Sequence, residues 1–325
     1  MKLVTFGVET PLGLIERIGA LANGRIIDLS AAYQHLLSDR GIYAAETLAN
    51  SILPPDMVAF LERWPFALDA AHEAVAFANK IDGDQAARAK RIWYNPTDTV
   101  PRIALRPRRI KDYLVYERHK RKAMEKKGLT MPDLWYRMPT YTNRNIMGYA
   151  HPDDDILWPS YSNKLDFEFE IGMVIGKSGK NIKAEDAALF IAGFTIYNDW
   201  SARDTQADEG TIGAGAGKSK DFDQGNVLGP CIVTADELDP ANIEMHLRVN
   251  GEEWSRGNTN GMKFTWGQII ENASRDETIF PGDVFASGTM DDGCSLELGK
   301  WINDRDVIEM EAKGIGVLMN RVRRS

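Results

Sequence analysis

The sequence contains little cysteine and no excess of basic residues. Its 325 residues include two cysteines, Cys231 and Cys294. Two thiols are too few for a disulfide scaffold or a thiolate zinc site. The 39 Lys and Arg residues against 47 Asp and Glu residues give a net charge of −8. Because nucleic-acid binding requires a basic face, this balance argues against nucleic acid as a partner.

The sequence also lacks a long hydrophobic run. No stretch approaches the roughly 18 apolar residues of a membrane-spanning helix, which argues against a membrane partner. The segment Met1–Gly7 reads as a strand and carries no small-residue cleavage site, so we expect no signal peptide. These absences together favour a cytoplasmic location.

The remaining composition, 43% hydrophobic and 26% charged, is that of a globular protein. At roughly 150 residues per domain, the length allows about two domains, and we place them at 1–101 and 102–325. The first contains a predicted hairpin around Asn23-Gly24, because a type I′ turn needs positive φ at both central residues. Helices are expected after caps at Ser30 and Asp56, and over Phe66–Lys80.

From about Arg102 the chain is rich in predicted β-structure. Asn250-Gly251 predicts a second hairpin, and short helices are expected over Ala184–Leu189 and Thr265–Ser274. The expected strands are Phe167–Ile175, Ala192–Asn198, Ile232–Thr234, Glu244–Val249, Val284–Ser287 and Val307–Ile315.

Two glutamates alternate with apolar residues in one predicted strand. Because successive side chains point to opposite faces, Glu168 and Glu170 share a face while Phe167, Phe169 and Ile171 face a core. Two neighbouring carboxylates require a cation or a raised pKa, and oxygen-only ligands favour Mg²⁺, Mn²⁺ or Ca²⁺. The alternative is an exposed acidic strand face.

A second signal lies where an apolar strand ends, in the segment Asn198–Gln206. Asp199 is followed by Arg203 and Gln206, at +4 and +7, and a helix would bring the three onto roughly one face. The alternative is a helix N-cap at Asp199 or Ser201.

A third signal pairs Asp112 with His119, one of five histidines. A lone histidine is more often structural than catalytic. The basic run from His119 to Lys122 continues to Lys127, and it is typical either of a solvated helix face or of a lid over an anionic substrate.

In this order and spacing, the motifs resemble the fumarylacetoacetate hydrolase family over roughly Arg102 to Val322. Asn198–Gln206 is the most specific match, because it reads like the family signature. Lys122 departs from the many short members that carry a glutamate three residues after the histidine. The other matching segments are Asp112 with His119, Glu168-x-Glu170, Pro281–Val284, Ser287–Thr289 and Ser295–Leu298.

The resemblance implies a site and a role for each residue in it. Metal ligands are expected at Asp112, Glu168, Glu170 and Asp199, and catalytic residues at His119, Glu297, Lys220 and Arg203. Substrate contacts are expected at Gln206, Tyr141 and Thr289. The segment Gly217–Phe222 offers two lysines; counting back from Leu228 favours Lys220, with Lys218 as the alternative.

The implied fold is a β-rich α+β mixed β-roll with a small N-terminal hairpin and helix domain, assembled as a homodimer. The implied activity is metal-dependent hydrolysis of a C–C bond in a β-diketo acid, with His119 activating water and the metal stabilising the enolate. The alternatives are a decarboxylase, hydratase or isomerase of a 2-oxo acid, or a non-catalytic ligand-binding protein.

Overall fold

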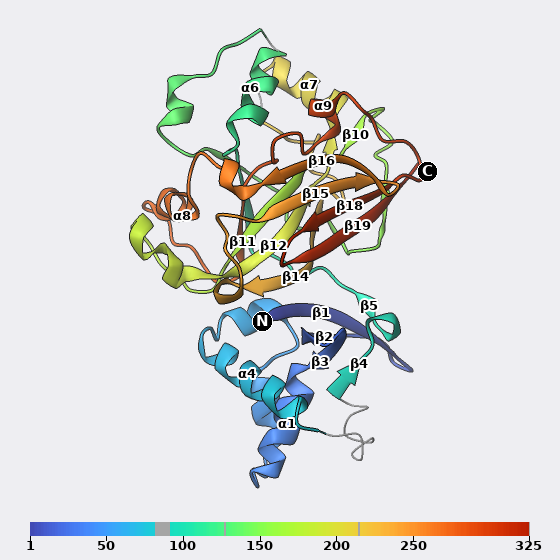
Figure 1. The fold of residues 1–325 in the computed structure, drawn as a ribbon, viewed down its shortest axis with the longest axis vertical. Coiled ribbons are helices and arrows are strands. Elements are labelled where there is room, and N and C mark those ends of the chain that lie inside the picture. Colours follow the sequence, from blue (N-terminus) through green and yellow to red (C-terminus); the bar gives the residue numbers. More distant parts are fainter. Residues whose placement is uncertain (82–91, 127, 214, 325) are drawn as a thin grey trace.

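The computed structural model of the protein describes residues 1–81, 92–126, 128–213 and 215–324. Within these ranges the chain forms a 12-stranded mixed sheet, a five-stranded sheet and a two-stranded ribbon (Figure 1). The main path of the large sheet is β4 (Trp93–Tyr94), β3 (Arg25–Asp28), β2 (Gly13–Ala22), β1 (Lys2–Thr10), β14 (Asn226–Thr234), β12 (Ile191–Asp199), β11 (Phe169–Ile175), β17 (Asp283–Ala286), β6 (Arg109–Tyr113) and β7 (Tyr141–Asn143). The short strands β5 (Val100–Pro101) and β8 (Tyr149–Ala150) pair with β1 and β14.

The N-terminal strands join the sheet of the remaining chain. Lys2 and Leu3 of β1 pair with Val233 and Ile232 of β14, so the predicted units 1–101 and 102–325 share one sheet. The hairpin between β2 and β3 forms as predicted, with φ of 51° at Asn23 and 73° at Gly24.

Helices cover the outer part of this N-terminal unit (Figure 1). They are α1 (Leu29–Asp39), α2 (Ala45–Ile52), α3 (Met57–Leu61) and α4 (Phe66–Ala78). Asp56 caps α3 as expected, but the predicted cap at Ser30 is wrong. Asp28 caps α1 instead, because its carboxylate ends β3 and accepts the Ala31 N–H, while Ser30 lies in the first turn and bonds to Asn50.

The second sheet packs against the large one. Its order is β16 (Glu252–Asn258), β15 (Glu244–Val249), β18 (Val307–Ala312), β19 (Gly316–Arg323) and β9 (Asp155–Leu157). The predicted Asn250-Gly251 turn joins β15 to β16. The expected Thr265–Ser274 helix is α8 (Trp266–Ser274), capped by Thr265, and the expected Ala184–Leu189 helix is a 3-10 helix, Ala184–Phe190.

Each face of the large sheet carries its own apolar core. One core joins Ile171 and Phe194 to Leu247 and Met310 of the second sheet. The other joins side chains of β6, β11 and β12 to the N-terminal helices. The apolar residues that these three strands contribute to it are Ile110, Val174, Ala192 and Tyr197.

Three helices gather at the end of the molecule opposite α1 and α4 (Figure 1). They are α6 (Glu117–Glu125), α7 (Arg203–Thr211) and α9 (Ser295–Leu298), beside the β10 (Leu165–Asp166) and β13 (Ser201–Ala202) ribbon. The architecture is thus the expected β-rich α+β class. No helix in the described ranges is long and apolar enough to span a membrane.

Candidate active site

Three carboxylates converge from three strands of the large sheet. Asp112 lies one residue before the end of β6, Glu170 is the second residue of β11 and Asp199 ends β12, and the side chains are all buried. One oxygen from each lies within 4.8 Å of the others. The atoms Asp112 Oδ1, Glu170 Oε1 and Asp199 Oδ1 are buried without a hydrogen-bond partner in the described ranges. Unpaired buried oxygens are costly, so this cluster requires protons or a cation.

Arg144 binds the remaining oxygens of two of these carboxylates. Its Nε lies 2.9 Å from Asp199 Oδ2, and its Nη2 pairs with Asp112 Oδ2. A third guanidinium nitrogen donates to Thr142 Oγ1 at 2.7 Å. Arg144 therefore fixes both carboxylates while leaving one oxygen of each unpaired.

The fourth predicted ligand, Glu168, is held by two cations. Lys220 Nζ lies 2.6 Å from Glu168 Oε2 and 2.6 Å from Asp199 Oδ2, so it bridges the two carboxylates. Arg203 Nη2 lies 2.8 Å from Glu168 Oε1. The structure thus brings Glu168 beside the three clustered carboxylates and pairs both of its oxygens with basic side chains.

The pKa values of Asp112 and Glu170 differ in direction from that of Glu168. Burial raises the pKa of Asp112 to about 6, although Arg144 opposes the shift. Burial also raises the pKa of Glu170 well above its usual range, and the neighbouring Asp112 carboxylate adds to the effect. Burial acts in the same sense on Glu168, but Lys220 and Arg203 hold the pKa of Glu168 well below its usual range. Asp112 and Glu170 therefore favour protons in the absence of a cation.

This donor set fits a hard divalent cation. The three unpaired atoms are all carboxylate oxygens, the ligand type that Mg²⁺, Mn²⁺ and Ca²⁺ prefer. A cation at this point would satisfy three buried oxygens at once. The exposed acidic face considered for Glu168 and Glu170 is excluded, because both side chains are buried.

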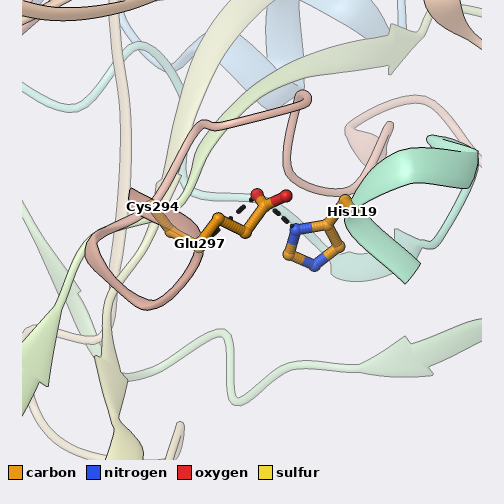
Figure 2. A group of neighbouring side chains, drawn as sticks. All are labelled: His119, Cys294 and Glu297. Carbon is orange, nitrogen blue, oxygen red and sulfur yellow. Dashed lines mark hydrogen bonds and ion pairs between the residues drawn. The ribbon is translucent and has the colours of Figure 1, made fainter. Parts of the chain in front are cut away.

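A histidine and a glutamate pair next to this cluster (Figure 2). His119 Nδ1 on α6 lies 2.7 Å from Glu297 Oε2 on α9. The second ring nitrogen, Nε2, lies on the edge of the imidazole away from Glu297. His119 is near enough to Glu168 to help lower the pKa of that acid. The family resemblance implied catalytic roles for both residues, and the structure brings them together.

The helix that carries His119 is fastened to the segment that carries Glu297. The His119 backbone N–H donates to Asp291 Oδ1 at 3.1 Å, and Arg118 pairs with Asp292 at 2.8 Å. Lys122 also pairs with Asp292. Lys122 of the predicted basic run therefore helps to bind α6 to this segment, while Lys127 lies outside the described residues.

The other predicted site residues occupy different positions. Arg203 Nη1 donates to Gln206 Oε1 at 2.8 Å, so Gln206 adjoins the site. Thr289 is buried next to Gly288. Tyr141 OH instead accepts a bond from Lys111 Nζ at 2.6 Å, and Tyr141 pairs across the strands with Tyr113 rather than with Asp112. Of the two candidate lysines, Lys220 is buried in the site and Lys218 donates to the Asp221 carbonyl in an exposed turn.

Two site residues escaped the sequence analysis. Asp166 is fully buried and accepts bonds from Arg203 Nε at 2.7 Å and from the Ser295 and Leu296 N–H groups of α9. The sequence could have indicated Asp166, because it lies two residues before Glu168 and continues the alternation of Glu168 and Glu170. Arg144 had no comparable signal.

One glycine is required by this geometry. The Gly288 N–H donates to Glu170 Oε2 at 3.0 Å, and its φ is +80°. A Cβ at this position would lie 2.1 Å from the Tyr113 carbonyl oxygen. Any other residue would therefore disturb the backbone that holds Glu170.

Solved structures share this fold over their whole length. A fumarylacetoacetate hydrolase from Exiguobacterium antarcticum covers 99% of this chain and 100% of its own, at a TM-score of 0.71 and 24% identity. Maleylpyruvate hydrolase from Sphingobium sp. SYK-6, solved with manganese(II) and pyruvate, covers 100% of both chains at a TM-score of 0.69 and 20% identity. The fold is therefore the mixed β-roll seen in these enzymes.

The sequence comparisons are more specific. The family model described as fumarylacetoacetate (FAA) hydrolase C-terminal matches residues 109–323. The mitochondrial oxaloacetate tautomerase of Rattus norvegicus is 32% identical over 308 residues, 92% of each chain. The chain therefore belongs to the fumarylacetoacetate hydrolase family.

Proposed function

We propose that this chain hydrolyses a C–C bond in a β-diketo acid, such as an acylpyruvate or a fumarylacetoacetate-like compound. The observation that carries the proposal is the His119–Glu297 pair, with a 2.7 Å contact, beside the acidic cluster. Residues 102–325 would form the catalytic unit. A water-activating base is what distinguishes hydrolysis from reactions that need only a stabilised enolate.

The divalent metal ion, Mg²⁺, Mn²⁺ or Ca²⁺, would be held by Asp112, Glu170 and Asp199. Glu168, expected as a fourth ligand by family resemblance, stands beside them with Lys220 and Arg203 on its oxygens. When bound, such an ion orients the oxygens of an oxo acid and stabilises an enolate as leaving group.

The chain's own side chains would perform the proton transfers. Glu297 holds the His119 ring by Nδ1 and stabilises its charged form, so Nε2 is the atom that takes a proton from water. Arg203 and Lys220 place positive charge where an oxyanion develops, and Gln206 adjoins Arg203. Removing one such donor typically costs about 10²–10³ in rate.

Keto–enol tautomerisation of an oxaloacetate-like acid is the second candidate. It is favoured by the 32% identity to the rat oxaloacetate tautomerase over 92% of both chains. The reaction needs the same enolate stabilisation, but it needs no base that activates water for attack on the substrate. Decarboxylation or other isomerisation of a 2-oxo acid would likewise dispense with that step, whereas hydration would add water without breaking a C–C bond.

One panel of substrates distinguishes the candidates. Fumarylpyruvate, acetylpyruvate, fumarylacetoacetate and oxaloacetate are each incubated with Mg²⁺ or Mn²⁺ and again with EDTA, and products are separated by chromatography. Hydrolysis predicts metal-dependent loss of the diketo-enol absorbance with two acid products, abolished in His119→Ala. The control is His246→Ala, since His246 lies on β15 between Glu244 and Glu253. Turnover of oxaloacetate alone, without cleavage products, would refute the hydrolase.

Two further expectations accompany this function. We propose that the chain forms a homodimer. Size-exclusion chromatography with light scattering tests this by measuring the molar mass in solution. We also propose a cytoplasmic location, although the rat relative is named as a mitochondrial protein. Fractionation of cells that produce the chain distinguishes the two compartments.

A further inference from the structure

Cys294 extends the His119–Glu297 pair into a three-residue group (Figure 2). Its Sγ lies 3.6 Å from Glu297 Oε2, the same oxygen that contacts His119 Nδ1 at 2.7 Å. The ligand atoms of all three residues lie within 4.8 Å of one another. Cys294 is fully buried, and the His119 and Glu297 side chains are 11% and 3% exposed. The proposed hydrolysis assigns no role to this thiol.

The chemistry of this group differs from that of the carboxylate cluster. It offers one nitrogen, one sulfur and one oxygen, a mixed set that suits Zn²⁺, whereas the cluster of Asp112, Glu170 and Asp199 offers oxygen alone. A second observation also points to a ligand here. Glu297 Oε1 is buried and has no hydrogen-bond partner in the described ranges.

The distances are close to those of tetrahedral zinc. With bonds of about 2.3 Å to sulfur and about 2.0 Å to nitrogen and oxygen, ligand atoms stand about 3.5 Å apart for S–O and about 3.3 Å for N–O. The Sγ–Oε2 separation is already 3.6 Å. The Nδ1–Oε2 separation of 2.7 Å must open by roughly half an ångström, as an ion replaces the shared proton.

We propose that Zn²⁺, or another thiophilic divalent cation, binds to His119, Cys294 and Glu297 and inhibits the enzyme. The bonds formed are Zn–N, Zn–S and Zn–O, and the thiol proton passes to solvent. The site is separate from the oxygen-only centre, so a bound Mg²⁺ does not occupy it. Zinc at Nδ1 removes Glu297 from its role of holding the imidazole, which stops proton transfer.

Binding is tested without reference to turnover. The full-length protein is saturated with Mg²⁺ and titrated with Co²⁺, which substitutes for zinc and shows a near-ultraviolet charge-transfer band when a thiolate is a ligand. We expect the band to rise to one equivalent, to disappear in Cys294→Ser and to persist in Cys231→Ser. Cys231 is the matched control, because it is equally buried and contacts the Ile315 carbonyl instead. No band in the wild-type protein, or a band that survives in Cys294→Ser, overturns the site.

Inhibition rests on the proposed role of His119 and is measured separately. Zinc is titrated into the reaction with Mg²⁺ in excess, using whichever substrate the panel shows to be turned over. Mutation of a residue that only hydrogen-bonds to a metal ligand typically lowers metal affinity about 10- to 100-fold. Loss of a direct ligand should therefore raise the half-inhibitory zinc concentration at least about tenfold. Equal inhibition of wild-type and Cys294→Ser places zinc at the carboxylates and refutes this arm. If the cobalt band appears but zinc does not inhibit, the metal site is supported and the proposed role of His119 in proton transfer is refuted.

Discussion

Arg144 is the buried cation on which the acidic cluster depends, and its replacement gives the sharpest test of the site. The change is Arg144→Met, which keeps part of the side-chain volume and removes the charge. The side chain is 4% exposed and pairs with Asp112 and Asp199, which are 4% and 0% exposed. Asp112 then loses its basic partner and Asp199 keeps only Lys220, in a site where few charges can be solvated.

Breaking a buried pair by removing one partner costs about 3–5 kcal/mol. For a chain of this size, we expect the melting temperature in EDTA to fall on the order of 10 °C. Because burial and Asp199 already raise the pKa of Asp112 against the effect of Arg144, proton uptake limits the loss at low pH, and the loss grows as pH rises. A bound divalent ion replaces the missing positive charge, so Mn²⁺ should raise the melting temperature more in the variant than in the wild type.

The assay is thermal unfolding followed by circular dichroism, in EDTA and in Mn²⁺, for the wild type and two variants. The matched control is Arg40→Met, because Arg40 pairs with Glu73 at 2.9 Å with the two side chains 52% and 46% exposed. Such surface pairs contribute about 0–1 kcal/mol. If Arg144→Met in EDTA melts within about 2 °C of the wild type, the buried pairs do not carry the stability assigned to them.

Three further outcomes are expected. Lys220→Met should lower kcat by about 10²–10³ while Lys218→Met stays near the wild type, and equal loss in both would remove Lys220 from the site. Glu297→Gln should lower kcat by about 10²–10⁴ with little change in KM; wild-type turnover would show that His119 needs no charged partner. Since burial raises the pKa of Asp112 from 3.8 to about 6, this group favours the metal-free fold at low pH, and that contribution is lost as pH rises through 6. Metal binding displaces the proton, so calorimetry should show Mn²⁺ affinity increasing with pH across this range, and a flat profile would contradict the shift.

Local pattern was enough to predict much of the site. Alternation along one strand placed Glu168 and Glu170 opposite Phe167, Phe169 and Ile171, and all three apolar residues lie in the core. The alternation holds even though the regular strand begins at Phe169 rather than Phe167. Period-two alternation depends on the backbone alone, which is why it could be read without tertiary information.

Contacts set by the tertiary path could not be predicted. Arg144 follows β7 and reaches Asp199, 55 residues away, only because β7 pairs with β6 and β6 lies beside β17. Tyr141 illustrates the converse, since its neighbour Thr142 pairs with Asp112 while Tyr141 pairs with Tyr113. A shift of one residue in a strand moves a side chain to the other face, and loose sequence matching cannot fix that register.

The apolar core under the N-terminal helices affects the strength of electrostatic interactions in the acidic cluster. On β6 and β12, Ile110 and Tyr197 lie two residues before Asp112 and Asp199 and share their faces, and Val174 lies four residues after Glu170 on β11. Those apolar side chains keep water from approaching the carboxylates along the sheet. An interaction between unit charges 4 Å apart grows from about 1 kcal/mol in water to about 4 kcal/mol in such surroundings. The helices of the first eighty residues thus help to exclude water and lower the effective dielectric constant around the carboxylates. They strengthen ion binding in this way although they contribute none of the proposed ligands.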